Sequence, residues 1–385
     1  MEEVISGQEG CSLKFYSYFR EGNETEGSIK MKKREKMVIA ILMSMALLTG
    51  CGSQAAAPEK ADAVEENTVE STQENTEEEQ QNDPEITITA VTVFDSGTAI
   101  AQGMEKMKEL LEEKTDGKVT MEIFPSGTTG GEKEQAEALV LGEVDMAAFG
   151  TLPISIYAPE YSFFDSPFVF RDREHFMNVW NSELGDGMRE SMLENNGLKT
   201  IGVMGRGYRH ITSNTPINSI DDIAKLTIRT PESALFTDTF GALGATCVPI
   251  ALTELFTSLQ TGVVNASEGP FDQIVTNKLY EVQDYITLSK YYYSISMWQM
   301  NADFFDGLPE EYQNAVMEAA QEATEYATAL GEQNEEELKK VCEDAGCTIL
   351  EMEDMEPYLE KVQGVMDRFF EEKWPVTSTE EIASY

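Results

Sequence analysis

The sequence predicts an α/β protein with two lobes and one unusually long helix late in the chain. Strand-like and helix-like segments alternate from residue 85 onward, a βαβ rhythm typical of a parallel or mixed sheet covered by helices. An amphipathic pattern from Pro309 to about Asp344 predicts the long helix, and Ala345-Gly346 is a natural stop. The 385 residues allow two domains of ordinary size, and no internal repeat is visible.

The first part of this alternation lies before residue 150. Its strands alternate polar and β-branched residues, and its first helix places methionine and leucine at helical spacing between charged side chains. The turn at Pro125-Ser126-Gly127 breaks the second strand. The predicted elements are strands over 86–93, 118–124 and 144–149 and helices over 103–114 and 132–141.

The second part follows the same rhythm between residues 198 and 267. The run 219–222, Ser-Ile-Asp-Asp, is typical of a helix entry. The predicted elements are strands over 198–204, 226–229 and 263–267 and helices over 233–243 and 253–260.

Composition excludes several classes of function. The formal charge is −42, and an acidic chain without clustered lysine and arginine argues against a nucleic-acid partner. The only two histidines are His175 and His210, which leaves too few groups for most metal or triad chemistry. The chain has no phosphate-binding loop, no metal-ligand spacing and no nucleophile elbow. We therefore expect neither an enzyme nor a cofactor or metal, and the residues offer no catalytic set.

Residues 1–50 are predicted to contain a lipoprotein signal peptide behind a doubtful leader. Basic residues at 32–36 precede an apolar stretch over 38–48, which has the layout of a signal peptide and is short for a membrane span. The run Leu48-Thr49-Gly50-Cys51 resembles the bacterial lipobox, in which the cysteine is lipidated and becomes the first mature residue. The alternative is a single membrane-anchoring helix with an incidental cysteine.

Translation is expected to begin at Met31 or Met37, because the stretch before Met31 has no targeting logic. After the lipidated cysteine, residues 51–84 are rich in Glu, Gln, Ala and Thr and contain little to bury. Such a segment cannot offset its ordering entropy and predicts a disordered acidic tether. The N-terminal part therefore predicts an extracytoplasmic protein that a lipid anchor holds at the cell membrane.

Cys342 and Cys347 flank the predicted end of the long helix. In an oxidising compartment they could form a local disulfide, and loose pairs at this spacing are also common as free thiols. The sequence leaves both alternatives open.

Three arginines lie at strand ends, where ligand crevices open in α/β sheets. Arg206 and Arg209 directly follow a predicted strand, and Arg229 ends another. The planar guanidinium makes two parallel charge-assisted hydrogen bonds to a carboxylate, so these residues are candidates for binding an organic acid. The alternative for each is a surface ion pair in an acidic protein.

At these arginines the chain resembles the solute-binding proteins of TRAP (tripartite ATP-independent periplasmic) transporters, the dicarboxylate-binding DctP-like family. The segment 207–214, Gly-Tyr-Arg-His-Ile-Thr-Ser-Asn, is similar to the family's "G-F-R-H/Q-x-T-N". Further similar segments lie at 165–170, 226–233, 242–249, 254–264 and 279–283. The resemblance covers essentially all of 85–385, and its motifs occur in the family's order.

The resemblance implies a two-lobed periplasmic-binding-protein-like fold with hinge strands and a long helix spanning both lobes. It implies one lobe from 85–206 with 297–334 and a second from 207–296 with 335–385. Such a protein captures a small organic acid, a carboxylate or a sugar acid, by lobe closure and delivers it to the membrane subunits of the transporter. Alternatives are a binding protein for an ATP-driven importer, a sensor, a surface enzyme and a structural lipoprotein.

The resemblance also implies the ligand contacts. Arg229 would form the principal salt bridge to the ligand carboxylate and Arg209 a second contact. Where the family commonly has "D-G-Q-E-N-P", this chain keeps Glu268 but has Gly269 in place of the asparagine that contacts ligand. Arg206 stands where the family often has a neutral residue, and it could meet a second acidic group. The rest of the expected pocket lining is Phe94, Asp95, Ser96, the surroundings of Glu132, Thr151, Phe170 and residues 296–298, which end in Trp298.

Overall fold

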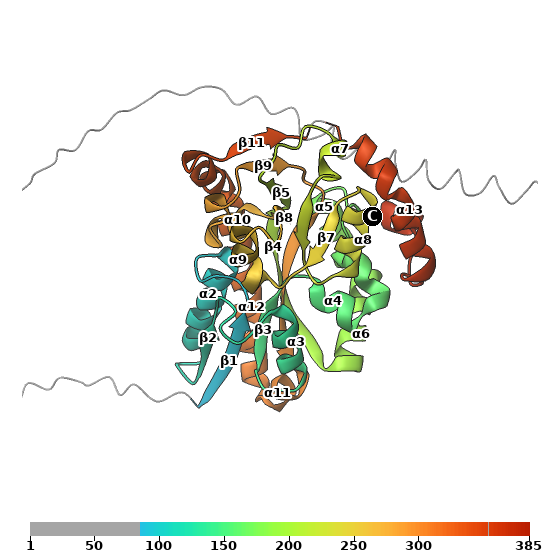
Figure 1. Ribbon diagram of the computed structural model, residues 1–385. Helices are drawn as coiled ribbons and strands as arrows, with labels where there is room; N and C mark the ends of the chain where they lie inside the picture. The colour runs from blue at the N-terminus through green and yellow to red at the C-terminus, as the bar shows by residue number, and fades with distance from the viewer. Residues whose placement is uncertain (1–84, 353) are drawn as a thin grey trace, which may run out of the picture. The chain divides into compact units, whose positions relative to one another are not determined.

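Two mixed β-sheets, each with its own helices, make up the part of the chain that the computed structural model describes, residues 85–352 and 354–385. The expected signal peptide, lipidated Cys51 and tether lie outside these residues. The first sheet has the order β2-β1-β3-β10-β4, and the second β11-β9-β5-β8-β6-β7 (Figure 1). The strands are β1 (Ile86–Thr92), β2 (Val119–Phe124), β3 (Met146–Phe149), β4 (Leu198–Tyr208), β5 (His210–Ser213), β6 (Thr227–Thr230), β7 (Thr246–Pro249), β8 (Ala266–Gly269), β9 (Tyr285–Leu288), β10 (Tyr293–Asn301) and β11 (Thr348–Glu351).

The helices of the described residues cover both sheets. They are α2 (Ala99–Lys114), α3 (Glu132–Val140), α4 (Leu152–Tyr157), α5 (Arg173–Trp180), α6 (Glu183–Asn196), α7 (Ile220–Ile223), α8 (Ala234–Ala242), α9 (Leu255–Gln260), α10 (Phe271–Thr276), α11 (Ala302–Gly307), α12 (Glu310–Asp344), α13 (Glu356–Glu372) and α14 (Thr379–Ala383). Three short 3₁₀ helices are η1 (Pro159–Asp165), η2 (Leu252–Glu254) and η3 (Leu279–Glu281). None of the helices over 85–352 and 354–385 combines the length and apolar character needed to cross a bilayer.

The first sheet and its helices form the first lobe. β1 pairs in parallel with β2 and β3, whereas β10 runs antiparallel to β3 and β4. α2 buries Met104, Met107 and Leu111 beneath this sheet, and Thr98 caps the helix by accepting a hydrogen bond from the amide of Ala101. The predicted βαβαβ order is confirmed, and α2 begins four residues earlier than its periodicity suggested because Ala99 and Ile100 are also buried.

The second sheet forms the second lobe, and the chain passes into it at two pairs of strands. β4 of the first sheet ends at Tyr208 and β5 of the second begins at His210, so Arg209 alone separates them. The return runs from β9 through residues 289–292 into β10. β4 and β10 pair along their length, and every residue of β10 is buried. These paired strands are the hinge strands that the resemblance implied.

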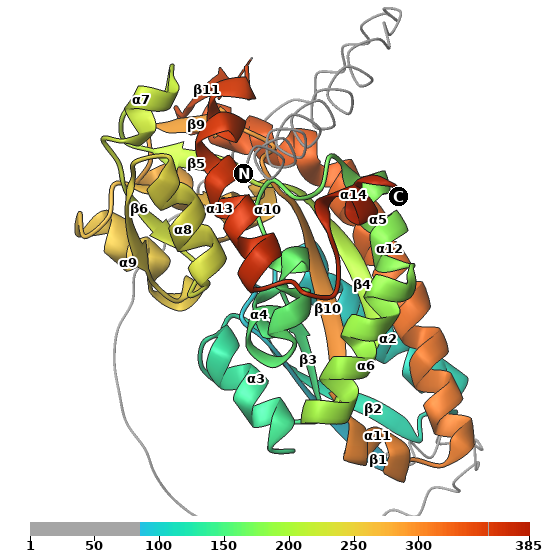
Figure 2. The ribbon, with the colours of Figure 1, turned by 90° about the vertical axis from the view of Figure 1, so that its right-hand side faces the viewer.

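Helix α12 is the predicted long helix and contacts both lobes. It has 35 residues, which corresponds to roughly 50 Å. Its first half, from Tyr312 to Ala327, packs in the core of the first lobe. Near its end, Leu338 and Cys342 pack with Leu259 and other residues of the second lobe. Figure 2 shows the course of this helix along the molecule.

The C-terminal segment also divides between the lobes. At the start of α13, Tyr358 and Val362 pack in a core of the second lobe. Farther along, Phe369 and Trp374 pack in a core of the first lobe, where the indole Nε1 of Trp374 donates to Ser162 at 2.9 Å. The assignment of 335–385 to the second lobe alone is therefore wrong for its last part, because α13 presents one apolar face to each lobe in turn.

Two further details concern the position of one strand and the alternative of a disulfide between Cys342 and Cys347. β8 spans Ala266–Gly269, three residues later than the strand predicted over 263–267. Cys342 and Cys347 are both free, buried thiols. Their link is a backbone hydrogen bond from the amide of Cys347 to the carbonyl of Cys342 at 3.0 Å.

Candidate functional site

A small cavity of about 50 Å³ lies between the two lobes and gathers three arginines. The first lobe, the second lobe and the paired strands β4 and β10 all contribute to its walls. The lining residues are Phe94, Glu132, Gly150, Thr151, Leu152, Asp165, Arg206, Arg209, Arg229, Pro231, Phe236, Leu252, Gln273 and Ser294.

A larger groove of about 780 Å³ runs along β4, α5 and α12 on the first lobe. Its one arginine, Arg173, pairs with Glu332 at 3.4 Å, and both side chains are more than half exposed. We place the candidate site in the smaller cavity, because it is where buried cationic groups converge.

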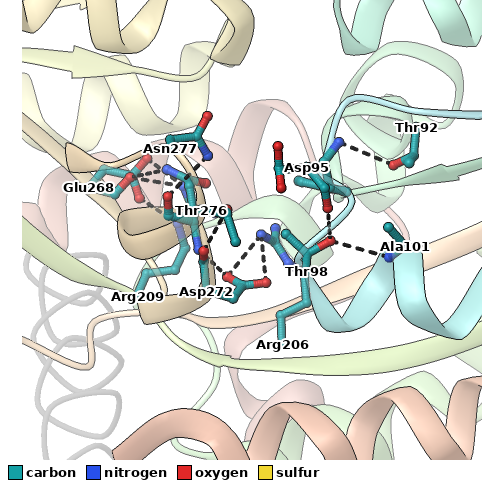
Figure 3. A network of polar contacts seen from close by, with 12 residues as sticks. Thr92, Asp95, Thr98, Ala101, Arg206, Arg209, Glu268, Asp272, Thr276 and Asn277 are labelled. Carbon is teal, nitrogen blue, oxygen red and sulfur yellow. Dashed lines mark hydrogen bonds and ion pairs between the residues drawn. The ribbon is translucent and has the colours of Figure 1, made fainter. Parts of the chain in front are cut away.

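Arg209 is held by Glu268 inside this cavity. The Nε and Nη2 atoms of Arg209 donate to the two carboxylate oxygens of Glu268 at 2.5 and 2.6 Å (Figure 3). Burial would raise the pKa of Glu268, but Arg209 and Arg229 outweigh burial and lower it. The hydroxyl of Tyr291 donates a further hydrogen bond to Glu268. Arg209 and Glu268 therefore form a charge-balanced, fixed wall of the site.

Arg206 is also paired, though less closely. Its Nη2 donates to the two carboxylate oxygens of Asp272 at 3.3 and 3.5 Å, as Figure 3 shows. Its guanidinium lies 4.1 Å from the ring centre of Phe94, an arrangement in which the ring face stabilises a cation. The Nε atom of Arg206 is buried and has no hydrogen-bond partner among the described residues.

Arg229 is the least paired of the three. Its Nε donates to the carbonyl of Ile250 at 2.8 Å, and its Nη1 lies 3.9 Å from Oε1 of Glu268. No hydrogen bond from the described residues reaches either terminal nitrogen. Burial lowers the pKa of Arg229 to about 10, and Glu268 offsets this effect only in part. A buried guanidinium with unsatisfied donors is suited to a ligand carboxylate.

The first-lobe wall of the cavity is acidic. Glu132, the first residue of α3, accepts a hydrogen bond from the amide of Gly150 at 2.5 Å. Gly150 permits this approach, because a Cβ there would lie 3.1 Å from the same Glu132 oxygen. Burial raises the pKa of Glu132 to about 7, against the lowering effect of this amide, and Asp165 raises it further.

Asp165 lies beside Glu132 and accepts three hydroxyl hydrogen bonds. Thr151 and Ser155 donate to it at 2.6 Å each, and Ser233 of the second lobe donates at 3.0 Å. Burial raises the pKa of Asp165, and these hydroxyls oppose that shift. The bond from Ser233 joins the two lobes at the edge of the cavity.

The structure brings together part of the expected pocket and separates the rest. Arg206, Arg209, Arg229, Glu132, Thr151 and Phe94 line the cavity, with Glu268 directly behind the arginines. Other expected residues do not line it: Gly269, residues 296 and 297, and the four residues Asp95, Ser96, Phe170 and Trp298.

Each of these four has another place. The Asp95 side chain accepts from the amide of Gly97 in the turn before α2, and Ser96 is exposed beside it. Phe170 is buried against the rings of Phe164 and Phe176. Trp298 is fully buried in the first-lobe core. From its strand, β10, the cavity receives Ser294 instead.

Gly269 makes room for a neighbouring side chain. It lies in β8 and is buried, and a Cβ at this position would lie 2.4 Å from Nε2 of Gln273. The same Nε2 donates to the carbonyl of Glu268 at 3.0 Å, and Gln273 lines the cavity. An amide from α10 thus occupies the space beside Gly269.

Sequence reasoning missed Gln273, Asp165 and Ser294 as lining residues. Gln273 lies four residues after Gly269, so the start of the next helix was the signal that could have identified it. In the described part of the chain no cluster of His, Cys, Asp and Glu has the arrangement of a metal site. The cavity thus presents the guanidinium of Arg229 beside the carboxyl groups of Glu132 and Asp165.

Comparison with known proteins finds similar chains among solute-binding proteins. Residues 90–373 match the model of a family described as bacterial extracellular solute-binding protein, family 7. The C4-dicarboxylate-binding periplasmic protein DctP of Rhodobacter capsulatus is 33% identical over 256 residues, which cover 65% of this chain and 75% of that protein. The 2,3-diketo-L-gulonate-binding periplasmic protein YiaO of Escherichia coli is 30% identical and covers 64% and 75%.

Solved structures show the same fold. A TRAP periplasmic solute-binding protein of Roseobacter denitrificans with bound L-galactonate superposes with a TM-score of 0.73 at 30% identity, covering 78% of this chain and 99% of that one. A protein of the same kind from Polaromonas, bound to D-erythronate, gives a TM-score of 0.73 at 27% identity, covering 78% and 97%. The two-lobed α/β fold expected from the sequence is confirmed.

Proposed function

This chain belongs to family 7 of the bacterial extracellular solute-binding proteins, and on that premise we propose that its interlobe cavity captures a small organic acid and that the closed form delivers it to TRAP membrane subunits. Members of this family bind solutes and are not enzymes. Relatives named for a C4-dicarboxylate and for a keto sugar acid support an acid as the ligand.

The observation that carries the proposal is the state of Arg229. This guanidinium is buried between the lobes, and its terminal nitrogens lack hydrogen-bond partners among the described residues. A ligand carboxylate would supply two acceptors and a compensating charge in a site largely removed from water. Contacts to both lobes would then favour the closed state over the open one.

Calorimetric titration of Arg229→Ala tests this role. The wild-type protein should bind at least one member of a panel of carboxylates and sugar acids, and Arg229→Ala should lose detectable binding, since truncating one partner of a buried charge pair costs about 2–5 kcal/mol. Arg368→Ala is the matched control, because Arg368 is exposed and pairs with Asp238 away from the cavity. Unchanged affinity in Arg229→Ala would refute the assignment.

We also propose that Cys51 is lipidated and anchors the protein outside the cytoplasm. Support comes from the lipobox-like run Leu48-Thr49-Gly50-Cys51 and from the extracellular family. Metabolic labelling with an alkyne fatty acid should mark the wild-type protein and leave Cys51→Ser unlabelled. Labelling of both proteins, or of neither, would reject the anchor.

A further inference from the structure

Two thiols at the end of α12 lie in one apolar cluster of the second lobe. Cys342 is fully buried and Cys347 is 8% exposed, and both pack in the cluster that contains Leu259 and Ile286. Within residues 85–352 and 354–385 the structure holds both thiols in the reduced form, as it does the half-buried Cys247. The pair does not line the interlobe cavity, so the capture of a solute gives it no role.

The turn that ends α12 determines how the two thiols face each other. The amide of Cys347 donates to the carbonyl of Cys342 at 3.0 Å, and the amide of Gly346 donates to the carbonyl of Glu343 at 3.0 Å. These two hydrogen bonds, with Gly346 at a φ of 104°, define a Schellman motif. The residues in the places of Cys342 and Cys347 commonly make a side-chain contact in this motif.

The same turn meets the geometric requirements of a disulfide. A disulfide needs Cα atoms about 4.4–6.8 Å apart, a separation typical of two residues that a main-chain hydrogen bond joins directly. The two side chains must also lie on the same side of the turn, and both thiols lie in the same buried cluster. The pair can therefore be bridged without a rearrangement of the main chain.

We propose that Cys342 and Cys347 are a modification site, at which a thiol–disulfide oxidoreductase outside the cytoplasm forms a disulfide that links the end of α12 to the start of β11. One cysteine loses its proton to solvent and attacks the disulfide of the oxidoreductase as a thiolate, which gives a mixed disulfide. The second cysteine attacks that bond and releases the oxidoreductase as a dithiol, so two thiols are oxidised and one disulfide is reduced. This inference rests on the proposed position of the protein outside the cytoplasm and does not depend on the ligand.

Burial determines when this reaction takes place. Burial raises the pKa of Cys342 to about 12, and the neighbouring Cys347 raises it further. Burial also raises the pKa of Cys347, whose thiol donates to the carbonyl of Gln283 at 3.2 Å. A protonated and enclosed thiol is a poor nucleophile, so the disulfide forms while the chain folds, before the cluster closes around the pair.

The bond acts on the helix that connects the two lobes. The first half of α12 packs in a core of the first lobe, and its end packs in a core of the second. Because the helix is attached to both cores, movement of the lobes pulls on the turn at Gly346. A covalent bond across this turn keeps the end of α12 on the second lobe.

Refolding in a glutathione buffer tests the modification site. The full chain is unfolded and reduced, then refolded with equal concentrations of reduced and oxidised glutathione, and free thiols are blocked with iodoacetamide. Trypsin cleaves after Lys340 and Lys361, so both cysteines fall in one peptide, residues 341–361. Mass spectrometry should find this peptide without alkyl groups and about 2 Da lighter than its dithiol form. Reduction before blocking should add two alkyl groups.

Thermal unfolding tests the link between α12 and β11. The refolded, oxidised protein should melt about 2–4 °C above the same protein after reduction. In Cys347→Ser this effect of reduction should disappear, and the serine hydroxyl can still donate to the carbonyl of Gln283. Cys247→Ser is the matched control and should keep both the oxidised peptide and the difference in melting temperature.

The outcomes separate this inference from the proposed function. Two alkyl groups on peptide 341–361 without prior reduction, or a cross-link from this peptide to any other cysteine, overturn the disulfide. Equal melting temperatures of the oxidised and reduced proteins overturn the link between α12 and β11. Refolding takes place in vitro, so its result stands whatever the labelling of Cys51 and the titration of Arg229→Ala show.

Discussion

Nη1 of Arg229 lies 3.9 Å from Oε1 of Glu268, while both oxygens of that carboxylate accept hydrogen bonds from Arg209. One buried carboxylate therefore lies beside two guanidinium groups but satisfies only one. Arg209 is a structural partner of Glu268, whereas Arg229 is the cation that would pair with the ligand carboxylate in the proposed function.

The two arginines should contribute differently to stability. Arg209→Ala leaves Glu268 buried without its main partner and should destabilise the fold by about 3–5 kcal/mol. Arg229→Ala removes a guanidinium whose pKa burial already lowers, so its cost should be clearly smaller. Urea unfolding of both variants measures the difference. If both variants lost the same unfolding free energy, both arginines would stabilise the buried carboxylate of Glu268 equally.

Glu132 should make stability depend on pH. The pKa of its carboxyl is near 4.5 when unfolded and about 7 when folded, because of burial and Asp165, with Arg206, Arg209 and Arg229 opposing the shift. Between pH 4.5 and 7 the folded state binds more protons, so this contribution falls as the pH rises and is lost above 7.

Glu132→Gln removes that dependence. The variant should therefore gain stability relative to the wild type between pH 5 and pH 8, by on the order of 2–3 kcal/mol. Melting temperatures at the two pH values give the comparison, with Glu137→Gln, an exposed position on the same helix, as the control. A constant difference between Glu132→Gln and the wild type would contradict the raised pKa.

The glycine-rich turn before α3 should act as a contact surface for lobe closure. A Cβ at Gly127 would lie 2.4 Å from Cγ2 of Thr253, and one at Gly131 would lie 3.6 Å from Cβ of Ala251, so the first-lobe turn meets η2 of the second lobe closely. Thr253 is exposed, and a bulky substitution there can fold but obstructs this approach.

Thr253→Tyr should therefore weaken ligand binding by at least about tenfold, because the ligand must offset a less stable closed state. Thr257→Tyr, exposed on the next helix, is the matched control. Small-angle scattering with and without ligand should show a reduced compaction in Thr253→Tyr. Wild-type affinity and compaction in this variant would exclude the contact.

The two serine hydroxyls that donate to Asp165 should affect different properties, one the stability of the fold and the other the closure of the lobes. Ser155 donates within the first lobe and Ser233 donates from the second, both to Oδ2. Loss of either hydrogen bond costs about 1 kcal/mol. Ser233→Ala should lose this as ligand affinity, about fivefold, whereas Ser155→Ala should lose it mainly as unfolding free energy. Calorimetric titration measures the ligand affinity of both variants, and urea unfolding measures their unfolding free energies. If the two variants lost the same amounts of both, Ser233 would have no role in closure.

Local sequence patterns predicted much of the fold and the arginines of the cavity. Periodicity located α12, and the motifs around 207–214 and 226–233 located Arg209 and Arg229, because a strand end fixes where its next side chains lie. The acidic residues of the cavity were harder to predict from the sequence. Asp165 joins the cavity wall through hydroxyls from two segments that are distant in the sequence: Thr151 and Ser155 at α4, and Ser233 before α8.

The strand β10 meets the cavity near its start rather than in its middle. Ser294 lines the cavity, and the register with β4 shifts just after it, between Ser294 and Ile295, where β4 has one extra residue, Arg206. The resemblance placed residues 296–298 in the pocket, whereas Trp298 lies in the first-lobe core. Helix α13 posed a similar problem, since its amphipathic pattern does not reveal that two different cores cover it.

The described chain begins and ends on the same lobe: β1 belongs to the first sheet, and Tyr385 packs in a core of the first lobe. The second lobe is thus, in topological terms, built from two segments inserted into the first lobe: residues 209–292, and the stretch that contains the end of α12, β11 and the start of α13. If the chain before residue 85 attaches the protein to a membrane, the first lobe would stay in place, and the second lobe would be the part that moves when the lobes close. A fluorophore fused after Tyr385 would stay with the first lobe. A fluorescent sensor of ligand binding would therefore need its second fluorophore on the second lobe.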